Sequence, residues 1–289
     1  AAMRANKTGV VVLVYPTRGT REEDSGDYDG EWGGGVRPGV AGVFTERDFV
    51  RLLAEGGAKI AINYSRSERE AEETAQACQK LGAETLVCQG DVSQDEDCRR
   101  IVAETVAKWG RVDGLMNNAG TTQLVADGNL DALSADDFLH IYSVNVVGAY
   151  QMTRAVAPHM KAQGRGSVVN TSSIAGVMGI GSSIAYAASK GAMNTMTLSL
   201  ARLLAPEIRV NAIAPGFITG RWWLDKLGQE GYDKMVAGVE ASVPLNHAGT
   251  PEDMAEAALF LLASSANITG EILISDGGNH LGGAPLIAR

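Results

Sequence analysis

Residues 93–120 read SQDEDCRRIVAETVAKWGRVDGLMNNAG. The stretch from Ser93 to Trp109 predicts a helix, and Gly110 ends it because glycine readily adopts the left-handed conformation of a helix cap. Val112 to Met116 predicts a strand, which runs into the polar turn Asn117-Asn118-Ala119-Gly120. A helix followed by a buried strand and a polar turn is one unit of an α/β fold.

The same alternation continues in both directions along the chain. Apolar, β-branched runs predict strands covered on both faces, and stretches rich in helix-forming residues predict helices. The predicted strands are residues 10–15, 59–63, 85–89, 112–116, 167–171, 209–213 and 272–275, and the predicted helices are 67–81, 93–109, 138–156 (after a capping box at Ser134-x-x-Asp137), 186–204 and 251–263. This order predicts an α/β fold: a single doubly wound parallel sheet of Rossmann type over residues 1–289, with helices on both faces. Ligands bind such sheets outside the carboxyl ends of the strands, where the strand order reverses.

Composition narrows the choice of partners. The 289 residues are 45% hydrophobic, and 34 acidic against 25 basic side chains give a net charge of -9. This charge disfavours nucleic acid and anionic membrane surfaces. Because the longest apolar runs are shorter than the roughly 18 residues of a membrane span, we expect no membrane segment and a cytoplasmic protein. The cysteines and histidines lack the spacing of a disulfide framework or of a metal site, so no metal is expected.

Tyr186 and Lys190 form a chemical motif. In the predicted helix they are four residues apart, so their side chains lie on one face. A nearby ammonium group favours the phenolate and lowers its pKa from about 10, which suits a general acid or base. Ser173, at the carboxyl end of a predicted strand, can hydrogen-bond a substrate carbonyl oxygen as that oxygen gains charge. The simpler interpretations are a surface Tyr–Lys pair and a serine in a turn.

Taken in order from about Lys59 to Gly278, several motifs resemble those of the short-chain dehydrogenase/reductase family. They are Asn117-Asn118-Ala119-Gly120, Ser172-Ser173, Tyr186-x-x-x-Lys190, Pro215-Gly216 and Asp276-Gly277-Gly278. The resemblance implies that the catalytic serine is Ser173 rather than Ser172, and that Tyr186 and Lys190 act with it. It adds Asn145, which would anchor a water that relays protons toward Lys190; a buried amide that satisfies backbone groups is the plainer interpretation. Within the family, the matching part of the chain most resembles β-ketoacyl-carrier-protein reductases. Membership of the family would also imply a homotetramer.

The resemblance also implies a nicotinamide dinucleotide site. Besides Tyr186 and Lys190, its expected residues are Asp91 and Val92 at the adenine, Asn118, Ala119 and Gly120 at the adenine ribose, and Pro215, Gly216 and Ile218 at the nicotinamide. After the second strand, where an acidic residue would bind the ribose 2'-hydroxyl of NAD, the chain has Ser65 and Arg66 instead. These offer donors to a 2'-phosphate, so we expect NADP(H) to be preferred over NAD(H). A solvated residue at a helix start is the alternative for Arg66.

The glycine-rich loop departs from the family pattern. Where Thr-Gly-x-x-x-Gly-x-Gly is expected after the first strand, only Thr17-Arg18-Gly19 resembles it, so Gly19 is the candidate for a pyrophosphate contact. Residues 22–49 follow as an atypical, acidic insertion. A displaced phosphate loop at residues 35–41 is disfavoured because Pro38 lacks an amide donor. An authentic insertion and a local reading-frame error both remain open.

These residues predict an NADP-dependent oxidoreductase that moves hydride between nicotinamide and the carbonyl or secondary alcohol of a small molecule. Residues 221–245, with two tryptophans, are the expected substrate lid and favour an apolar substrate. One alternative is a catalytically silent Rossmann-fold binding or scaffold protein that has lost the phosphate loop; a scaffold needs none of the four catalytic residues. The other is a nucleotide-sugar epimerase or dehydratase, although such relatives usually carry a larger carboxyl-terminal domain. The fold alone does not identify the substrate.

Overall fold

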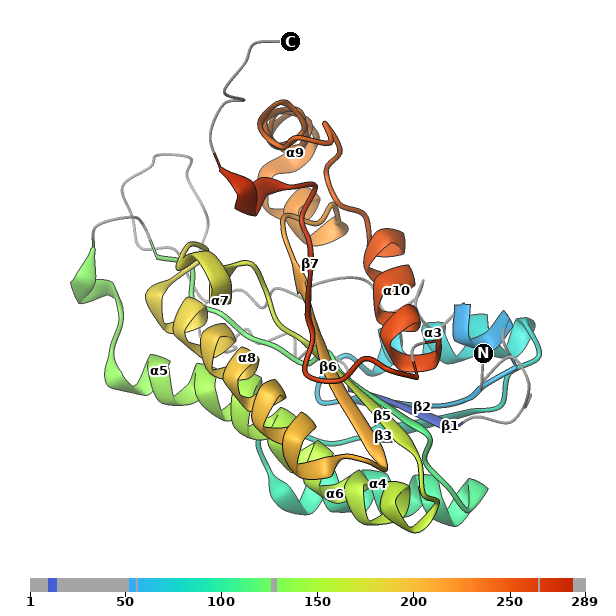
Figure 1. Cartoon of the computed structure of the whole chain (residues 1–289). Helices are drawn as coiled ribbons and strands as arrows, with labels where there is room; N and C mark the ends of the chain where they lie inside the picture. Colours follow the sequence, from blue (N-terminus) through green and yellow to red (C-terminus); the bar gives the residue numbers. More distant parts are fainter. Residues whose placement is uncertain (1–9, 15–51, 56, 126–128, 265, 283–289) are drawn as a thin grey trace.

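A seven-stranded parallel sheet forms the centre of the protein (Figure 1). The structure, a computed structural model, describes residues 10–14, 52–55, 57–125, 129–264 and 266–282. The strands are β1 (Val10–Val14), β2 (Lys59–Tyr64), β3 (Thr85–Gln89), β4 (Gly114–Asn117), β5 (Gly166–Thr171), β6 (Ile208–Pro215) and β7 (Ile272–Ser275). Their order is β3-β2-β1-β4-β5-β6-β7. The order therefore reverses between β1 and β4, where a doubly wound sheet binds its ligands.

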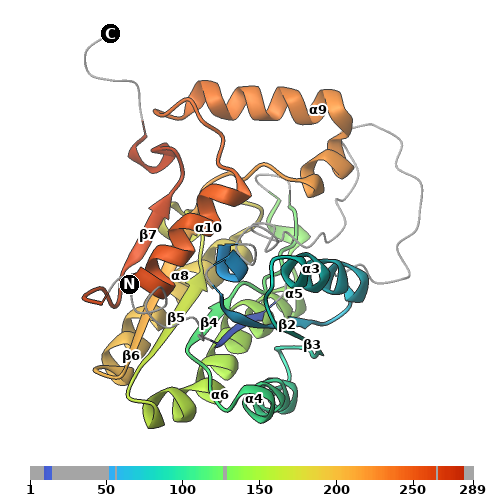
Figure 2. The ribbon, with the colours of Figure 1, turned by 90° about the vertical axis from the view of Figure 1, so that its right-hand side faces the viewer.

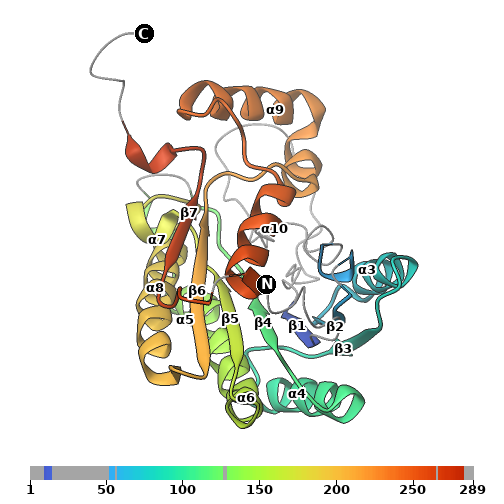
Figure 3. The ribbon, with the colours of Figure 1, turned by 45° about the vertical axis from the view of Figure 1, so that its right-hand side comes forward.

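Helices cover both faces of the sheet, as predicted (Figure 3). The longer helices are α3 (Glu68–Lys80), α4 (Asp95–Trp109), α5 (Ala135–Tyr142), α6 (Ala149–Ala162), α8 (Ile184–Leu204), α9 (Arg221–Ser242) and α10 (Pro251–Leu259). One apolar core packs α3 and α10 against Ile60 and Ile62 of β2. The other packs α4, α6 and α8 against the opposite face, which includes Ala61. Successive residues of one strand thus contribute to different cores.

The predicted elements are confirmed over the described residues, with two interruptions by π-helical segments. Both β3 and β7 have the predicted limits. The capping box starts α5: the Asp137 amide donates to the Ser134 hydroxyl at 3.2 Å, and the Ser134 amide donates to the Asp137 carboxylate at 2.8 Å. The helix predicted over 138–156, however, is split by the π-helical segment Ser143–Gly148, labelled η3, which separates α5 from α6. The helix predicted over 251–263 ends at Leu259, where the π-helical segment Phe260–Ser264 begins.

The predicted lid segment is largely helical. It forms α9, which contains one non-helical residue, Gly228, with φ of 65°. Figure 2 shows α9 set apart from the helices that pack on the sheet. None of the described helices combines the length and the apolar character required to cross a lipid bilayer. Gly19 and residues 22–49 lie outside the described residues.

The three cysteines, Cys78, Cys88 and Cys98, are buried and free. Burial raises the pKa of the Cys78 thiol to about 11 and those of the Cys88 and Cys98 thiols to about 12, since the thiolate would lose its hydration. They therefore behave as small apolar residues of the core.

Candidate active site

The loops that the sequence singles out meet at the carboxyl ends of the central strands. Asn118-Ala119-Gly120 follows β4, Ser172-Ser173 follows β5, and Pro215 ends β6. Helix α8 carries Tyr186 in its first turn, where the Tyr186 amide donates to the hydroxyl of the N-cap Ser183 at 3.2 Å. This cap fixes where α8 begins and so places the phenol at that end of the sheet.

Lys190 is completely buried. Its Nζ donates to the Thr171 carbonyl at 2.7 Å and lies 5.5 Å from the centre of the Tyr186 ring. Burial lowers the pKa of the Lys190 amine to about 7, because the ammonium form loses its hydration. The amine can therefore take up or release a proton near neutral pH.

The phenol of Tyr186 is also buried, with 8% of the residue exposed. Burial raises its pKa to about 12, and the hydrogen bond with Ser173 lowers it only in part. The Tyr186–Lys190 spacing predicts the opposite direction of the pKa shift, from the ammonium of Lys190. That prediction is wrong here because the removal of water from the phenolate outweighs the stabilisation that its neighbours provide. At neutral pH Tyr186 holds its proton.

The two adjacent serines have different partners. Ser173 lies beside Tyr186, and its Oγ accepts the Ala175 amide at 3.1 Å. Ser172 is 0% exposed, and its hydroxyl donates to the Asn194 carbonyl oxygen, Oδ1, at 2.5 Å. The Ser173 hydroxyl, and not that of Ser172, therefore lies next to the Tyr186 phenol.

Asn145 is fully buried in the π-helical segment η3. Its Oδ1 accepts the Thr121 amide at 2.7 Å, and its Nδ2 donates to the Thr121 carbonyl and to the Ser189 hydroxyl, both at 3.0 Å. The amide therefore satisfies backbone groups, as the plainer interpretation predicts. Ser189 in turn donates to the Tyr186 carbonyl at 2.7 Å, so Asn145 is tied to the helix that carries the phenol.

Gly120 is the point at which these elements meet. A Cβ atom at Gly120 would lie 3.7 Å from the Asn145 Oδ1 and 3.7 Å from the Lys190 Nζ. Beside it, the Asn118 Oδ1 accepts the Thr171 hydroxyl at 2.9 Å, which joins the ends of β4 and β5. The loop after β4 therefore passes directly over the buried amine and the buried amide.

A separate polar hollow of about 310 Å³ lies beyond the ends of β2 and β3. Its lining includes Ser65, Arg66 and Asp91, which are three of the residues expected to bind the cofactor. Arg66 is exposed and forms no ion pair with any residue that the structure describes. The Ser65 Oγ is buried and lacks a hydrogen-bond partner among those residues. Arg66 and the unsatisfied Ser65 hydroxyl line the same hollow, and both offer donors to an oxygen-rich anionic group such as a phosphate.

Asp91 and Val92 are held in place by their neighbours. The Asp91 amide donates to the Asp97 carboxylate at 2.8 Å, and the Val92 carbonyl accepts from the Gln151 Nε2 at 2.7 Å. Val92 is 2% exposed and packs against Gly148, where a Cβ atom would lie 2.6 Å from a Val92 methyl group. The loop after β3 is thereby fixed against η3.

Pro215, Gly216 and Ile218 continue from β6 at the same edge of the sheet. The Gly216 amide donates to the Ser275 carbonyl at 2.9 Å. A Cβ atom on Gly216 would lie 2.6 Å from that of Asp276, so this position requires glycine. Ile218 is 8% exposed and forms an isolated parallel bridge with Gly249. The turn is thus held by backbone pairing on both sides.

Beneath these loops lies a network of buried polar groups, of which the sequence motifs include only Asn117. Asn117 Nδ2 donates to the Asn170 Oδ1 at 2.9 Å and to the Thr153 hydroxyl at 3.2 Å, and Asn170 Nδ2 donates to the Thr197 hydroxyl at 3.0 Å. Polar residues inside otherwise apolar strands, such as Asn117 and Asn170, are the signal that could have found them. The network links β4, β5, α6 and α8.

The chain is similar to several known proteins. The family profile described as enoyl-(acyl carrier protein) reductase matches residues 47–280. The chain is 40% identical over 231 residues to the ketoacyl reductase 2 named for the granaticin polyketide synthase of Streptomyces violaceoruber, covering 80% of this chain and 89% of that protein. It superposes on a crystal structure of a short-chain dehydrogenase/reductase from Burkholderia xenovorans with a TM-score of 0.79 and 35% identity, covering 95% of this chain and 99% of the other.

The chain belongs to the short-chain dehydrogenase/reductase family. A further crystal structure, that of NAD+-bound xylitol dehydrogenase, matches this short-chain dehydrogenase/reductase with a TM-score of 0.75 and 29% identity, over 93% of this chain and 98% of that one. The protein is accordingly an oxidoreductase that acts on CH–OH groups with a nicotinamide cofactor.

Proposed function

We propose that this short-chain dehydrogenase/reductase uses NADP(H) to interconvert a carbonyl and a secondary alcohol on a small molecule, with Tyr186 as the general acid and base. When bound, the nicotinamide supplies or accepts the hydride. One observation supports the proposal most strongly: Ser173, Tyr186 and Lys190 lie together at the carboxyl ends of the strands. The Tyr186 phenol lies beside the Ser173 hydroxyl, and the centre of its ring lies 5.5 Å from the Lys190 amine.

In the reductive direction the phenol gives up a proton. Burial keeps Tyr186 protonated at neutral pH, and an alkoxide formed beside it is basic enough to take that proton. Ser173 donates a hydrogen bond to the substrate oxygen as negative charge develops there. In the oxidative direction the same groups act in reverse, and Tyr186 removes the alcohol proton.

Lys190 and Asn145 support this proton transfer. A pKa of about 7 allows the Lys190 amine to return a proton to the phenolate after each turnover. Lys190 would also hold the nicotinamide ribose. Asn145, bonded to both polar groups of the Thr121 backbone, fixes the loop over Lys190 and would anchor the relay of protons from solvent.

The preference for NADP(H) rests on the hollow at the ends of β2 and β3. Arg66 and Ser65 would hold the 2'-phosphate there, with Asp91 and Val92 at the adenine. Asn118, Ala119 and Gly120 would line the adenine ribose, and Pro215, Gly216 and Ile218 the nicotinamide. Gly19 remains the proposed pyrophosphate contact.

Helix α9 is the proposed substrate lid. Its Trp223 ring packs on Phe217, with ring centres 5.7 Å apart, so α9 is attached to the turn that follows β6. Leu227 on the same helix is 39% exposed. Aromatic and aliphatic side chains in this position favour a substrate with apolar bulk next to its carbonyl.

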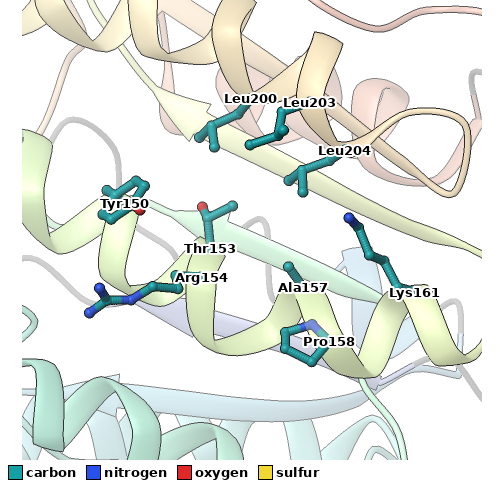
Figure 4. A pocket seen from close by; sticks show the side chains of 9 residues that line it. All are labelled: Tyr150, Thr153, Arg154, Ala157, Pro158, Lys161, Leu200, Leu203 and Leu204. Carbon is teal, nitrogen blue, oxygen red and sulfur yellow. The ribbon is translucent and has the colours of Figure 1, made fainter.

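We also infer a homotetramer located in the cytoplasm. Helices α6 and α8 expose Tyr150, Leu198 and Leu203, the last with an exposed fraction of 71%. Tyr150 and Leu203 border an apolar hollow of about 380 Å³ between the two helices (Figure 4). Clustered apolar side chains on a surface mark a protein–protein contact, and a second copy of the chain is the proposed occupant.

A cofactor oxidation screen tests the proposed function. Purified protein is mixed with NADPH or NADH and with a panel of ketones and ketoacyl thioesters, and the loss of absorbance at the nicotinamide band is followed. We expect turnover with kcat/KM at least roughly tenfold higher for NADPH, and a smaller ratio for Arg66→Ala because a charge-assisted phosphate contact is lost. An equal or better rate with NADH contradicts the NADP preference. No turnover together with no thermal shift on adding NADPH would instead support a scaffold.

A further inference from the structure

A side chain outside the proposed catalytic set lies on the same face of α8. Tyr186, Lys190 and Asn194 are spaced four residues apart, so they follow one another on successive turns. Asn194 is half-buried, and both ends of its amide are engaged. Its Oδ1 accepts the Ser172 hydroxyl at 2.5 Å, and its Nδ2 donates to the Gly176 carbonyl at 3.2 Å.

These two partners enclose Ser173. Ser172 precedes it at the end of β5, and Gly176 belongs to the short helix α7 (Ala175–Met178) that follows it. The Gly176 amide donates to the Ser173 carbonyl at 3.0 Å, and the Ala175 amide donates to the Ser173 Oγ at 3.1 Å. The direction of the Ser173 hydroxyl is therefore set by the position of α7.

The contact between α7 and α8 leaves no room for adjustment. A Cβ atom on Gly176 would lie 2.4 Å from the Lys190 carbonyl carbon and 2.7 Å from the Gly191 nitrogen. The backbone of α7 thus lies directly on the backbone of α8 beside Lys190. In this contact the Asn194 Nδ2 bonds the α7 backbone at Gly176, and its Oδ1 accepts the Ser172 hydroxyl, which also lies 3.3 Å from the Lys190 carbonyl as a second acceptor.

We propose that Asn194 is a positioning residue for the reaction. By holding Ser172 and Gly176 against α8, it fixes the Ser173 hydroxyl relative to the Tyr186 phenol, so that one substrate oxygen can contact both. Asn194 touches neither hydride nor substrate and acts through Ser173. This inference rests on the proposed function, in which Ser173 and Tyr186 contact that oxygen.

A double-mutant cycle tests the inference. Turnover is measured for the full-length protein, Asn194→Ala, Ser173→Ala and the double variant, with the substrate and cofactor that the wild-type protein uses. We expect Asn194→Ala to lower kcat by about 10- to 100-fold, because a catalytic group misplaced by about 1 Å can cost about a hundredfold in rate, with KM for the cofactor changed less than about twofold. In the Ser173→Ala background the same substitution should lower kcat no further.

Two further variants separate positioning from folding. Thr195→Ala lies on the same helix, exposed and next to Asn194, and should leave kcat unchanged. Ser172→Ala deletes the hydroxyl at the other end of the link, together with its longer bond to the Lys190 carbonyl at 3.3 Å. It should lower kcat at least as much as is expected for Asn194→Ala, and it still tests the link if Asn194→Ala fails to fold.

The outcomes distinguish this inference from the function on which it rests. If Asn194→Ala lowers kcat by the same factor with and without Ser173, its role is merely structural and the inference is overturned. It is also overturned if Ser173→Ala abolishes turnover while Asn194→Ala and Ser172→Ala do not lower it. If neither Ser173→Ala nor Tyr186→Phe affects turnover, the proposed function itself is wrong.

Discussion

The Lys190 amine occupies a fully buried position with the Thr171 carbonyl as its hydrogen-bond acceptor. The Tyr186–Lys190 spacing in the sequence predicts that the two side chains share a helix face, and this is confirmed. It does not predict the pKa values, because these depend on how completely other elements cover the helix. Burial moves both groups toward their neutral forms.

Replacing Lys190 should change how stability depends on pH. The amine binds a proton more weakly in the folded state, with a pKa of about 7, than at its ordinary value of 10.5, so unfolding takes up a proton between these values. The Lys190 contribution therefore makes the free energy of unfolding rise with pH in this window, by up to about 1.4 kcal/mol per pH unit.

The Lys190→Met variant lacks this contribution. The unfolding free energy of the variant should not rise with pH in this way, whereas that of the wild-type protein should. The variant's unfolding free energy minus that of the wild-type protein should therefore decrease as the pH is raised from 7 to about 9.5, below the range in which Tyr186 titrates. Denaturant unfolding of both proteins across this range measures the difference. A difference that stays constant with pH would show that the wild-type amine is normally hydrated.

The hydrogen-bond partners that position the catalytic groups are the part of the site that the sequence could not reveal. Ser173, Tyr186 and Lys190 stand out because their chemistry is specific and their spacing is regular. Ser172 and Asn194 do not, because a serine and an asparagine at those positions acquire a role only when α7 packs on α8.

The π-helical segment η3 shows how an element departs from its predicted form. Apolar spacing over 138–156 predicts one continuous helix, and α5 and α6 do follow that spacing on either side. Within η3, however, Asn145 bonds to Thr121 and Gly148 packs on Val92. Thr121 and Val92 lie in loops that follow other strands. The π-helical turn of η3 therefore coincides with tertiary contacts, which the local sequence does not predict.

A methyl group at Gly148 should disturb this element. Gly148→Ala would place a Cβ atom 2.6 Å from a Val92 methyl and 3.3 Å from its carbonyl oxygen. We expect a loss of about 1–3 kcal/mol in the free energy of unfolding, as for other overpacked positions. Gly238→Ala in α9 is the control: it has open space around it, and alanine should stabilise a helix by about 0.5–1 kcal/mol. Equal effects of the two substitutions in denaturant unfolding would contradict the tight contact.

The architecture of the whole molecule could be predicted further than the site. Strand and helix alternation from 59 to 275 predicts the parallel sheet and its covered faces, because buried strands must be apolar and each crossover needs a helix. The strand order itself required the structure, since many orders satisfy the same alternation. Residues 22–49 lie outside the described residues, so their interpretation as an atypical insertion stays a prediction.

The exposed apolar side chains of α6 and α8 predict that the protein assembles through these helices. Leu203→Glu should place a charge in the proposed subunit contact and shift the protein from tetramer toward smaller species at micromolar concentration. Light scattering coupled to size-exclusion chromatography measures the mass. Leu81→Glu, on the 44%-exposed residue that caps α3, is the matched control and should leave the mass unchanged. A wild-type monomer would contradict the proposed assembly outright.

The role of the Tyr186 hydroxyl is the claim on which the proposed chemistry depends most. Tyr186→Phe keeps the buried ring and removes the single hydroxyl, so fold and NADPH binding should persist, as judged by the thermal shift on adding NADPH. Turnover of the substrate found in the screen should fall by at least about a hundredfold, because the group that transfers the proton is gone. Turnover within twofold of the wild-type rate, with NADPH still bound, would contradict it.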